Sequence, residues 1–216
     1  MIVLASKSSG RLATLRAAGI EPQVAVSEVD ERAVEQQVRS TQPDCGPQEV
    51  VQALALAKAQ AVACQLGRSG QVAGWRYVVG CDSMLLIDGQ LVGKPASVDD
   101  AVERWRSMRG RSATLFTGHA VIALSPTEGY SPDSPQAQGV SRAVINFAEV
   151  SDKEIAAYVA SGEPMYCAGA FTIDGLGGAF IESIEGDPHG VVGLSLPLLR
   201  RLLAQLDVTW TDLWQS

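Results

Sequence analysis

The 216-residue sequence predicts an α/β fold, and two observations support this class. Short apolar segments typical of buried strands alternate along the chain with amphipathic or alanine-rich segments typical of helices. The composition, 46% hydrophobic and 19% charged residues, is that of a folded globular protein. No repeat and no linker-like stretch divides the chain. We therefore expect a single domain over residues 1–216, built as one core or as two lobes.

Charge and cysteine usage narrow the classes of partner and compartment. The net charge of -7 argues against nonspecific binding to nucleic acid or to an anionic membrane, which needs a basic face. The N-terminal MIVLASKSSGR lacks the features of a secretory signal, and no run looks long enough to cross a membrane. The four cysteines are widely spaced, without a CxxC pair, which favours reduced thiols in a cytoplasmic protein.

The first third of the chain predicts two strands and two helices. Residues 2–5 (IVLA) are typical of a short buried strand, and a helix that ends at Gly19 follows the serine-rich loop 6–10. Residues 24–26 alternate like a second strand, and SEVDER after them is expected to be an acidic loop. The alanine-rich residues 47–66 predict a long helix, which Gly67 ends.

The remaining elements follow from turn and capping signals. Asp88-Gly89 is a hairpin turn within residues 77–93, and Ser97 begins a helix that reaches about Met108. Five further segments complete the pattern: strands at 113–124 and 141–150 around a Pro/Ser/Gly-rich hairpin tip, a helix at 152–161 with a Ser151/Glu154 capping box, a strand at 178–186, and a helix at 196–206.

The strand and hairpin VVGCDSMLLIDGQLVGKP, residues 78–95, carry the most unusual acid. Asp82 interrupts an apolar run, and a carboxylate there needs a cation, a metal or several hydrogen-bond donors. Asp82 is thus a candidate general base or metal ligand, or a structural residue that bonds to neighbouring amides. The adjacent Cys81 raises the possibility of a catalytic thiol, although a small apolar residue on a buried strand is the favoured interpretation.

Four cations are candidates for an anion site. Arg11 lies in the first turn of a helix after a serine loop, where it suits either a phosphate site or an ordinary solvated N-terminus. Lys58 lies in the apolar segment ALALAKAQAVA and either faces solvent or pairs with phosphate. Lys94 lies in a rigid Gly-Lys-Pro corner, which fixes where its ammonium points. Arg111 either joins the same site or complements a helix C-terminus.

A second group of acids, Glu28, Asp30 and Glu31, is expected to lie in a solvated loop. Magnesium is commonly held by one or two carboxylates together with substrate phosphates, so one acid from this group and Asp82 would suffice. The two histidines, His119 and His189, are too isolated for a zinc site. The chain has no GxSxG motif, so a serine hydrolase is unsupported.

The order of these pieces carries a resemblance. The motifs run LASKSSGRLATL, SEVDE, ALAKAQ, GCDS, DGQLVGKP, MRGRSATLFTG, YVASGEP and IEGDPHGVVGLSL. In this order they resemble the Maf family of nucleotide pyrophosphatases over about residues 2–204. The most specific part is the Asp-containing strand followed by GKP and then by GR and TG.

The resemblance implies an elongated, two-lobed mixed-sheet fold similar to that of inosine-triphosphate pyrophosphatases, with a central cleft. Such proteins hydrolyse nucleoside triphosphates between the α and β phosphates, with a divalent cation such as Mg²⁺ or Mn²⁺. It implies Asp82 as the catalytic proton acceptor, with Glu31 and Asp82 at the metal. Together with the residues discussed above, the expected substrate-binding set is Ser6, Ser8, Arg11, Lys58, Ser83, Lys94 and Arg111. A homodimer is a further expectation.

This sequence departs from the family's pattern at several positions, which leaves the base preference open between pyrimidine, 7-methyl-GTP and broad use. Gly10 stands where an arginine is common, and Ser83 matches neither residue type that follows the catalytic acid in the two preference groups. Three further departures are Ala113, Cys167 and Ser195.

Two other functions remain as alternatives to nucleotide housecleaning. One is a nucleotide-binding regulator of septum formation with little turnover, since the family is linked to cell division. The other is a sugar or amino-acid enzyme on a similar scaffold, for which the sequence offers no matching site.

Overall fold

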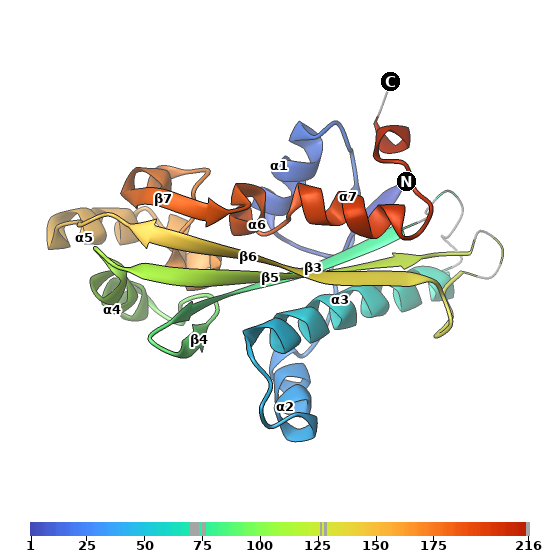
Figure 1. Ribbon diagram of the computed structural model, residues 1–216, viewed down its shortest axis with the longest axis horizontal. Coiled ribbons are helices and arrows are strands. Elements are labelled where there is room, and N and C mark those ends of the chain that lie inside the picture. The colour runs from blue at the N-terminus through green and yellow to red at the C-terminus, as the bar shows by residue number, and fades with distance from the viewer. Residues whose placement is uncertain (70–73, 75–76, 126, 128, 215–216) are drawn as a thin grey trace. The chain divides into compact units, whose positions relative to one another are not determined.

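The computed structural model describes residues 1–69, 74, 77–125, 127 and 129–214, and within them the strands form one seven-stranded sheet (Figure 1). The sheet order is β2-β1-β3-β5-β6-β7, and β4 pairs with β3 outside this path. β1 is parallel to β2 and β3, whereas the β3–β4 and β6–β7 pairs are antiparallel, so the sheet is mixed. The strands are β1 (Ile2–Leu4), β2 (Gln23–Val24), β3 (Tyr77–Ile87), β4 (Gln90–Val92), β5 (Ser112–Ala123), β6 (Gln136–Phe147) and β7 (Ile181–Gly186).

The predicted α/β class is confirmed, and most predicted helices begin and end within a few residues of the observed ones. The α-helices are α1 (Ser9–Ala17), α2 (Glu31–Thr41), α3 (Pro47–Ser69), α4 (Val98–Met108), α5 (Asp152–Ala160), α6 (Pro188–Val192) and α7 (Leu196–Ala204). Four short 3-10 helices are η1 (Glu163–Tyr166), η2 (Ala168–Ala170), η3 (Leu176–Phe180) and η4 (Trp210–Leu213). The predicted hairpin is β3–β4, with Asp88 and Gly89 both at positive φ in its turn.

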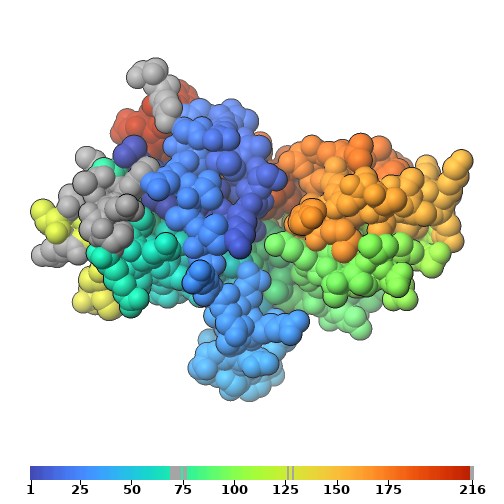
Figure 2. Space-filling view, turned by 180° about the vertical axis from the view of Figure 1, so that it is seen from behind, coloured from blue at the N-terminus to red at the C-terminus, as the bar shows by residue number. Residues whose placement is uncertain are grey.

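The prediction of a loop for SEVDER was wrong in its second half. Asp30 caps α2 by accepting from the Ala33 N–H at 3.1 Å, and Glu31 begins the helix. No residue of α2 is fully buried, and its apolar face is limited to the half-buried Val34 and Val38, one helical turn apart. The helix packs on α3 and stands out from it in Figures 1 and 2. Asp30 as a cap and the four-residue spacing of Val34 and Val38 are the sequence signals for this helix.

Strand β6 begins at Gln136, five residues before the predicted start, so part of the expected loop is strand. The early residues are mostly polar because this end of the strand is largely exposed, apart from Ala137. Ala137 packs in a core cluster with Leu198 and Leu202 of α7. Pairing with β5, seen in the Ala123 N–H bond to the Pro135 carbonyl, and packing on α7 accompany this early start of the strand.

Helix α3 is long and apolar enough to cross a membrane by length and composition alone, contrary to the sequence-based expectation that no segment is. Half of its most apolar window is buried inside the protein. Its alanines and valines, including Ala55, Ala59 and Val62, pack in one cluster with Val3 of β1 and Val78 of β3. We therefore interpret α3 as a core helix that covers a face of the sheet.

Residue contacts divide the described chain into two compact units, each with its own core. Unit 1 comprises residues 1–82, 117–141 and 193–216, and unit 2 comprises residues 83–116 and 142–192. In unit 1 successive residues of β1 serve opposite faces of the sheet. Ile2 and Leu4 pack against Leu15 of α1 and the leucines of α7, and Val3 packs against α3.

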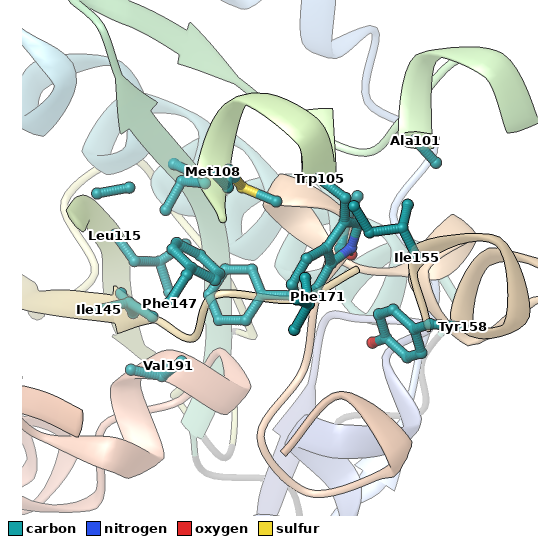
Figure 3. Packing of buried hydrophobic residues seen from close by; sticks show 14 of the residues in the cluster. Ala101, Trp105, Met108, Leu115, Ile145, Phe147, Ile155, Tyr158, Phe171 and Val191 are labelled. Atoms are coloured by element: carbon teal, nitrogen blue, oxygen red, sulfur yellow. The ribbon is translucent and has the colours of Figure 1, made fainter. Parts of the chain in front are cut away.

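The core of unit 2 is built around an aromatic cluster, shown in Figure 3. Trp105 of α4 meets Phe147 and Tyr158 edge to face, with ring centroids 5.6 and 5.3 Å apart. Its indole N–H donates to the Ala170 carbonyl at 2.7 Å, so the buried polar atom is satisfied.

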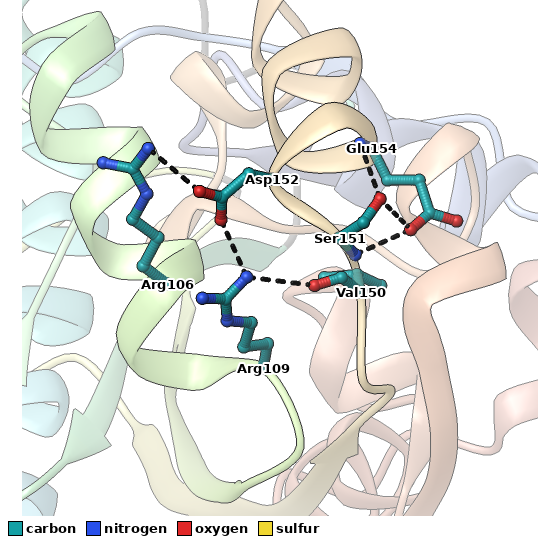
Figure 4. A network of polar contacts seen from close by, with 6 residues as sticks. All are labelled: Arg106, Arg109, Val150, Ser151, Asp152 and Glu154. Carbon is teal, nitrogen blue, oxygen red and sulfur yellow. Dashed lines mark hydrogen bonds and ion pairs between the residues drawn. The ribbon is translucent and has the colours of Figure 1, made fainter.

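Surface ion pairs join α4 to the start of α5 in the same unit (Figure 4). Asp152 accepts from Arg109 at 2.7 Å and from Arg106 at 3.4 Å. The predicted capping box is present, with the side chains of Ser151 and Glu154 each bonded to the other's backbone N–H. The ion pairs hold the start of α5 against α4, and the capping box fixes the first turn of α5.

Candidate active site

Two glycines let α3 lie directly on the sheet beside the candidate acid. A Cβ on Gly80 of β3 would lie 2.2 Å from the Ala55 carbonyl oxygen, and a Cβ on Gly118 of β5 would lie 2.2 Å from that of Val51. Because side chains alternate along a strand, Gly80 and Asp82 face α3, and Cys81 faces the opposite side. The close approach of α3 thus brings this helix to the acid.

Lys58 lies on the stripe of α3 that faces the sheet, three residues after Ala55. Its ammonium contacts Asp82 Oδ1 at 2.5 Å and Glu31 Oε1 at 2.6 Å. The Lys58 and Asp82 side chains are only 11% and 10% exposed, whereas Glu31 is 56% exposed. Lys58 therefore does not face solvent, and its ammonium compensates the negative charge of Asp82 within the apolar strand.

The surroundings of Asp82 raise the pKa of its carboxyl. Burial raises the pKa of its carboxyl, and the Lys58 ammonium and the Arg11 guanidinium counteract this rise. The net shift is upward, so the carboxylate is more basic than an exposed aspartate. A more basic carboxylate is the better candidate for a general base.

Cys81 has the opposite character. Its side chain is fully buried in the apolar cluster with Ile2 and Leu194, and burial raises the pKa of the thiol to about 11. A thiol with this pKa is protonated at neutral pH and is a poor nucleophile. The structure favours the interpretation of Cys81 as a core residue.

Arg11 is buried and organises three segments of unit 1. It donates from Nε to the Gly193 carbonyl at 2.8 Å, and from Nη1 to the Cys81 carbonyl at 2.8 Å and to Ser6 Oγ at 3.0 Å. The expectation of a solvated arginine is wrong, because the loop after β1, the strand β3 and the turn at Gly193 all contribute acceptors. Arg11 holds these three segments together beside Asp82.

The two serines of the first loop have local roles as well. Ser8 caps α1 by accepting from the Arg11 N–H at 3.3 Å, and Ser6 Oγ accepts from the Ser8 N–H at 3.2 Å. Six residues of the expected set lie in unit 1, and they form two bonded groups: Ser6, Ser8 and Arg11, and Glu31, Lys58 and Asp82. Arg11 connects the first group to the second through the carbonyl of Cys81, the neighbour of Asp82.

The other three expected residues belong to unit 2. Lys94 follows β4, and the register that pairs Leu85 with Val92 directs the chain at Lys94 back along β3 toward Ser83. The Lys94 side chain is exposed, whereas Pro95 next to it is buried. Ser83 is half-buried on β3.

The contacts of Arg111 support its structural interpretation. Its guanidinium pairs with Asp88 of the hairpin turn, and Nη1 donates to the Ser107 carbonyl in the last turn of α4 at 3.1 Å. Arg111 thus complements the C-terminus of α4, one of the two roles that the sequence allows.

His119 is a buried residue whose role the sequence did not indicate. Its Nε2 accepts from the Ser195 N–H at 2.8 Å, and its Nδ1 lies 3.0 Å from the Thr117 carbonyl. A backbone N–H only donates, so Nε2 carries no proton and the ring is a neutral Nδ1–H tautomer. Ser195 also caps α7 through the Leu198 N–H. The segment that supplies the Gly193 carbonyl to Arg11 is thereby anchored two residues later.

The carboxylates at Lys58 fit the donor set of a hard divalent cation. Glu31 and Asp82 oxygens both lie within 2.6 Å of the Lys58 ammonium nitrogen, so the lysine occupies the position between these two oxygens. Among the described residues no three histidine, cysteine or acidic side chains form a metal cluster. Two carboxylates completed by substrate phosphates are the common arrangement for Mg²⁺.

Comparisons with known proteins show the family of the chain. The family model described as "Maf-like protein" matches residues 1–206. The protein named nucleoside triphosphate pyrophosphatase from Rhodococcus opacus is 52% identical over 99% of this chain and 96% of its own length. The protein of that name from Salinispora tropica is 52% identical over 99% of this chain and 87% of its own length.

One solved structure, a nucleoside-triphosphatase/dITP/XTP pyrophosphatase from Mycobacterium abscessus, is 15% identical and aligns with a TM-score of 0.40 over 95% of this chain and 97% of that one. The family assignment rests instead on the sequence matches, which span nearly all of the chain. By these matches the chain belongs to the Maf-like protein family.

Proposed function

We propose that this protein hydrolyses nucleoside triphosphates at the α–β phosphoanhydride, giving the nucleoside monophosphate and pyrophosphate. The observation that carries the proposal is the buried Asp82–Lys58 pair with the more exposed Glu31 at the same ammonium, in a chain whose relatives are named nucleoside triphosphate pyrophosphatases. A buried acid beside a cation is a costly arrangement that a purely structural role does not need.

In this proposal Asp82 accepts the proton of the attacking water. The upward shift of its pKa makes it a better base, while the Lys58 ammonium lowers the pKa and favours the ionised form. A triphosphate carries about four negative charges, and phosphoryl transfer depends mainly on positioning and charge neutralisation. Lys58 and Lys94 are the proposed phosphate ligands, and Arg11 keeps the Ser6 loop and β3 in place around the reacting group.

A divalent cation, when bound by Glu31 and Asp82, would neutralise phosphate charge and polarise the scissile bond. Glu31 is the more exposed of the two acids, so it is accessible to a cation that arrives with the nucleotide. Mg²⁺ and Mn²⁺ are the proposed ions.

A panel of purine and pyrimidine triphosphates, including 7-methyl-GTP, tests the reaction and the base preference together. With Mg²⁺ present we expect pyrophosphate release by the wild type, and a loss of at least about a hundredfold in Asp82→Asn. Asp133→Asn is the matched control, because Asp133 is an exposed aspartate of the same unit. Equal pyrophosphate release by Asp82→Asn and the wild type would overturn the proposal.

The same panel separates the roles of the two acids. Glu31→Gln is expected to raise the Mg²⁺ concentration needed for half-maximal rate while leaving most of the rate at saturating metal. Asp82→Asn is expected to stay inactive at every metal concentration. Tight nucleotide binding without turnover by the wild type would instead favour the regulator of septum formation.

A further inference from the structure

The Gly93–Pro95 corner is held from outside by an ion pair on α4. Arg104 donates to both carboxylate oxygens of Asp100, at 2.8 and 2.7 Å. Its Nη1 donates to the Gly93 carbonyl at 2.7 Å, and its Nη2 reaches the Lys94 carbonyl at 3.5 Å. One guanidinium thus connects the first turns of α4 to two successive carbonyls of the corner.

The partner of Arg104 completes the contact on the other side of the lysine. Asp100 Oδ2 accepts from the Ala96 N–H at 2.7 Å. The Gly93 carbonyl also accepts from the Gly169 N–H at 3.0 Å. Peptide groups both before and after Lys94 are therefore fixed, and all of these residues belong to unit 2.

This arrangement is more than an ordinary helix-surface pair. An i,i+4 pair on a solvated helix face needs no bond outside the helix. Here the Arg104 and Asp100 side chains are 18% and 31% exposed, and each also bonds to the backbone of the corner. The planar guanidinium makes these bonds in fixed directions, which a lysine in its place does not reproduce.

We propose that Asp100 and Arg104 are positioning residues that hold the backbone at Lys94, so that its exposed ammonium is presented to substrate phosphate. The proposal rests on the proposed function, in which Lys94 is a phosphate ligand. The proline of the corner restricts one dihedral of the chain, and the ion pair supplies the remaining restraint on the peptide groups around the lysine.

A double-mutant cycle tests this coupling. The variants are Lys94→Ala, Arg104→Ala and the double variant, with kcat and KM measured for the preferred triphosphate. We expect each single variant to lose about ten- to a hundredfold in kcat/KM. Because Arg104 acts through Lys94, the double variant should fall to within about twofold of Lys94→Ala alone. Arg106→Ala is the matched control, since Arg106 is an exposed arginine of the same helix.

Thermal unfolding of every variant separates positioning from folding. Where Arg104→Ala fails to fold, Asp100→Asn replaces it, because it keeps the side-chain volume and removes the ion pair. Amide hydrogen exchange gives a readout without turnover, and we expect faster exchange at Ala96 in Arg104→Ala than in the wild type. Unchanged exchange there would overturn the proposal.

Kinetic outcomes distinguish this proposal from the proposed function. Losses that multiply in the double variant, or an Arg104→Ala enzyme as active as the wild type, overturn the positioning role alone. A Lys94→Ala variant whose kcat/KM equals that of the wild type also overturns the positioning role, but it does not contradict hydrolysis with Asp82 as the base. If the wild type hydrolyses no triphosphate, the proposed function fails. The positioning role is then tested by calorimetry, with the affinity for inorganic triphosphate measured for the wild type, the two single variants and the double variant. The same double-mutant cycle applied to these affinities decides it.

Discussion

Lys58 Nζ and Asp82 Oδ1 lie 2.5 Å apart, both nearly excluded from solvent. The pair joins α3 to β3, and Glu31 at the start of α2 contacts the same ammonium. The charge of Asp82 therefore depends on a helix that meets the strand only in the folded protein.

Replacing Lys58 with methionine should leave the Asp82 carboxylate buried without its main cation. The pKa of Asp82 then rises further, since burial raises it and the ammonium lowers it. We expect the acid limb of the pH–rate profile to move to higher pH and stability to fall by about 3 kcal/mol or more near neutral pH.

The sign of the pH dependence follows from the direction of that shift. A carboxyl with a raised pKa favours the folded state at low pH, and this contribution is lost as the pH rises through the folded pKa. The stability difference between wild type and Lys58→Met should therefore grow from acidic to neutral pH in urea titrations. A constant difference would contradict the burial of an ionised Asp82. Lys58→Arg, which keeps the charge, is the control.

Gly80→Ala should destabilise the protein and lower activity together. The new Cβ meets the Ala55 carbonyl oxygen, an atom of helix backbone that cannot turn away, so α3 must move from β3 and carry Lys58 with it. We expect a loss of about 2 kcal/mol or more in urea unfolding.

Gly67→Ala on the same helix is the matched control. Its Cβ would lie 3.8 Å from the Tyr130 nitrogen, an ordinary contact, so the helix propensity of alanine should give up to about 1 kcal/mol of stabilisation. Equal effects of the two substitutions would show that the close approach of α3 is not what Gly80 provides.

Cys81 should be inert in the native protein. With a thiol pKa of about 11 and no exposure, it should resist a thiol reagent at pH 8 until the chain unfolds. The half-buried Cys45 and Cys64 provide the internal comparison, read by mass spectrometry of labelled peptides. Cys81→Ala should keep most of the activity. A large loss of kcat with an intact fold would revive the catalytic thiol.

His119→Leu should destabilise the protein by about 1–3 kcal/mol, because the buried Ser195 N–H loses its acceptor. Urea unfolding measures the change. Gln138→Ala is the control, since Gln138 makes an exposed side-chain bond to Gln52 at 3.2 Å and should cost little. A His119→Leu protein as stable as the control would show that the Ser195 bond is dispensable.

The sequence by itself determined most of the local structure and named the principal candidate acid. Alanine-rich composition located α3, the Asp88-Gly89 turn located the β3–β4 hairpin, capping signals located α4 and α5, and the polar interruption of an apolar strand singled out Asp82. These features depend on neighbours within a few residues, so a linear pattern contains them. The motif order then indicated the family that the matches show.

Only the tertiary structure decided what surrounds the acid. The sequence left Lys58 and Arg11 open between a solvated side chain and a phosphate ligand, and the structure buries both through partners 24 to 182 residues away in the chain. Helix α2 was missed because it only partly buries two valines, and the contact of Arg104 with the Gly93–Pro95 corner gave no signal because its acceptors there are backbone carbonyls. Ion pairs and backbone hydrogen bonds between distant segments leave no period in a sequence, and at this site they determine which charges face one another.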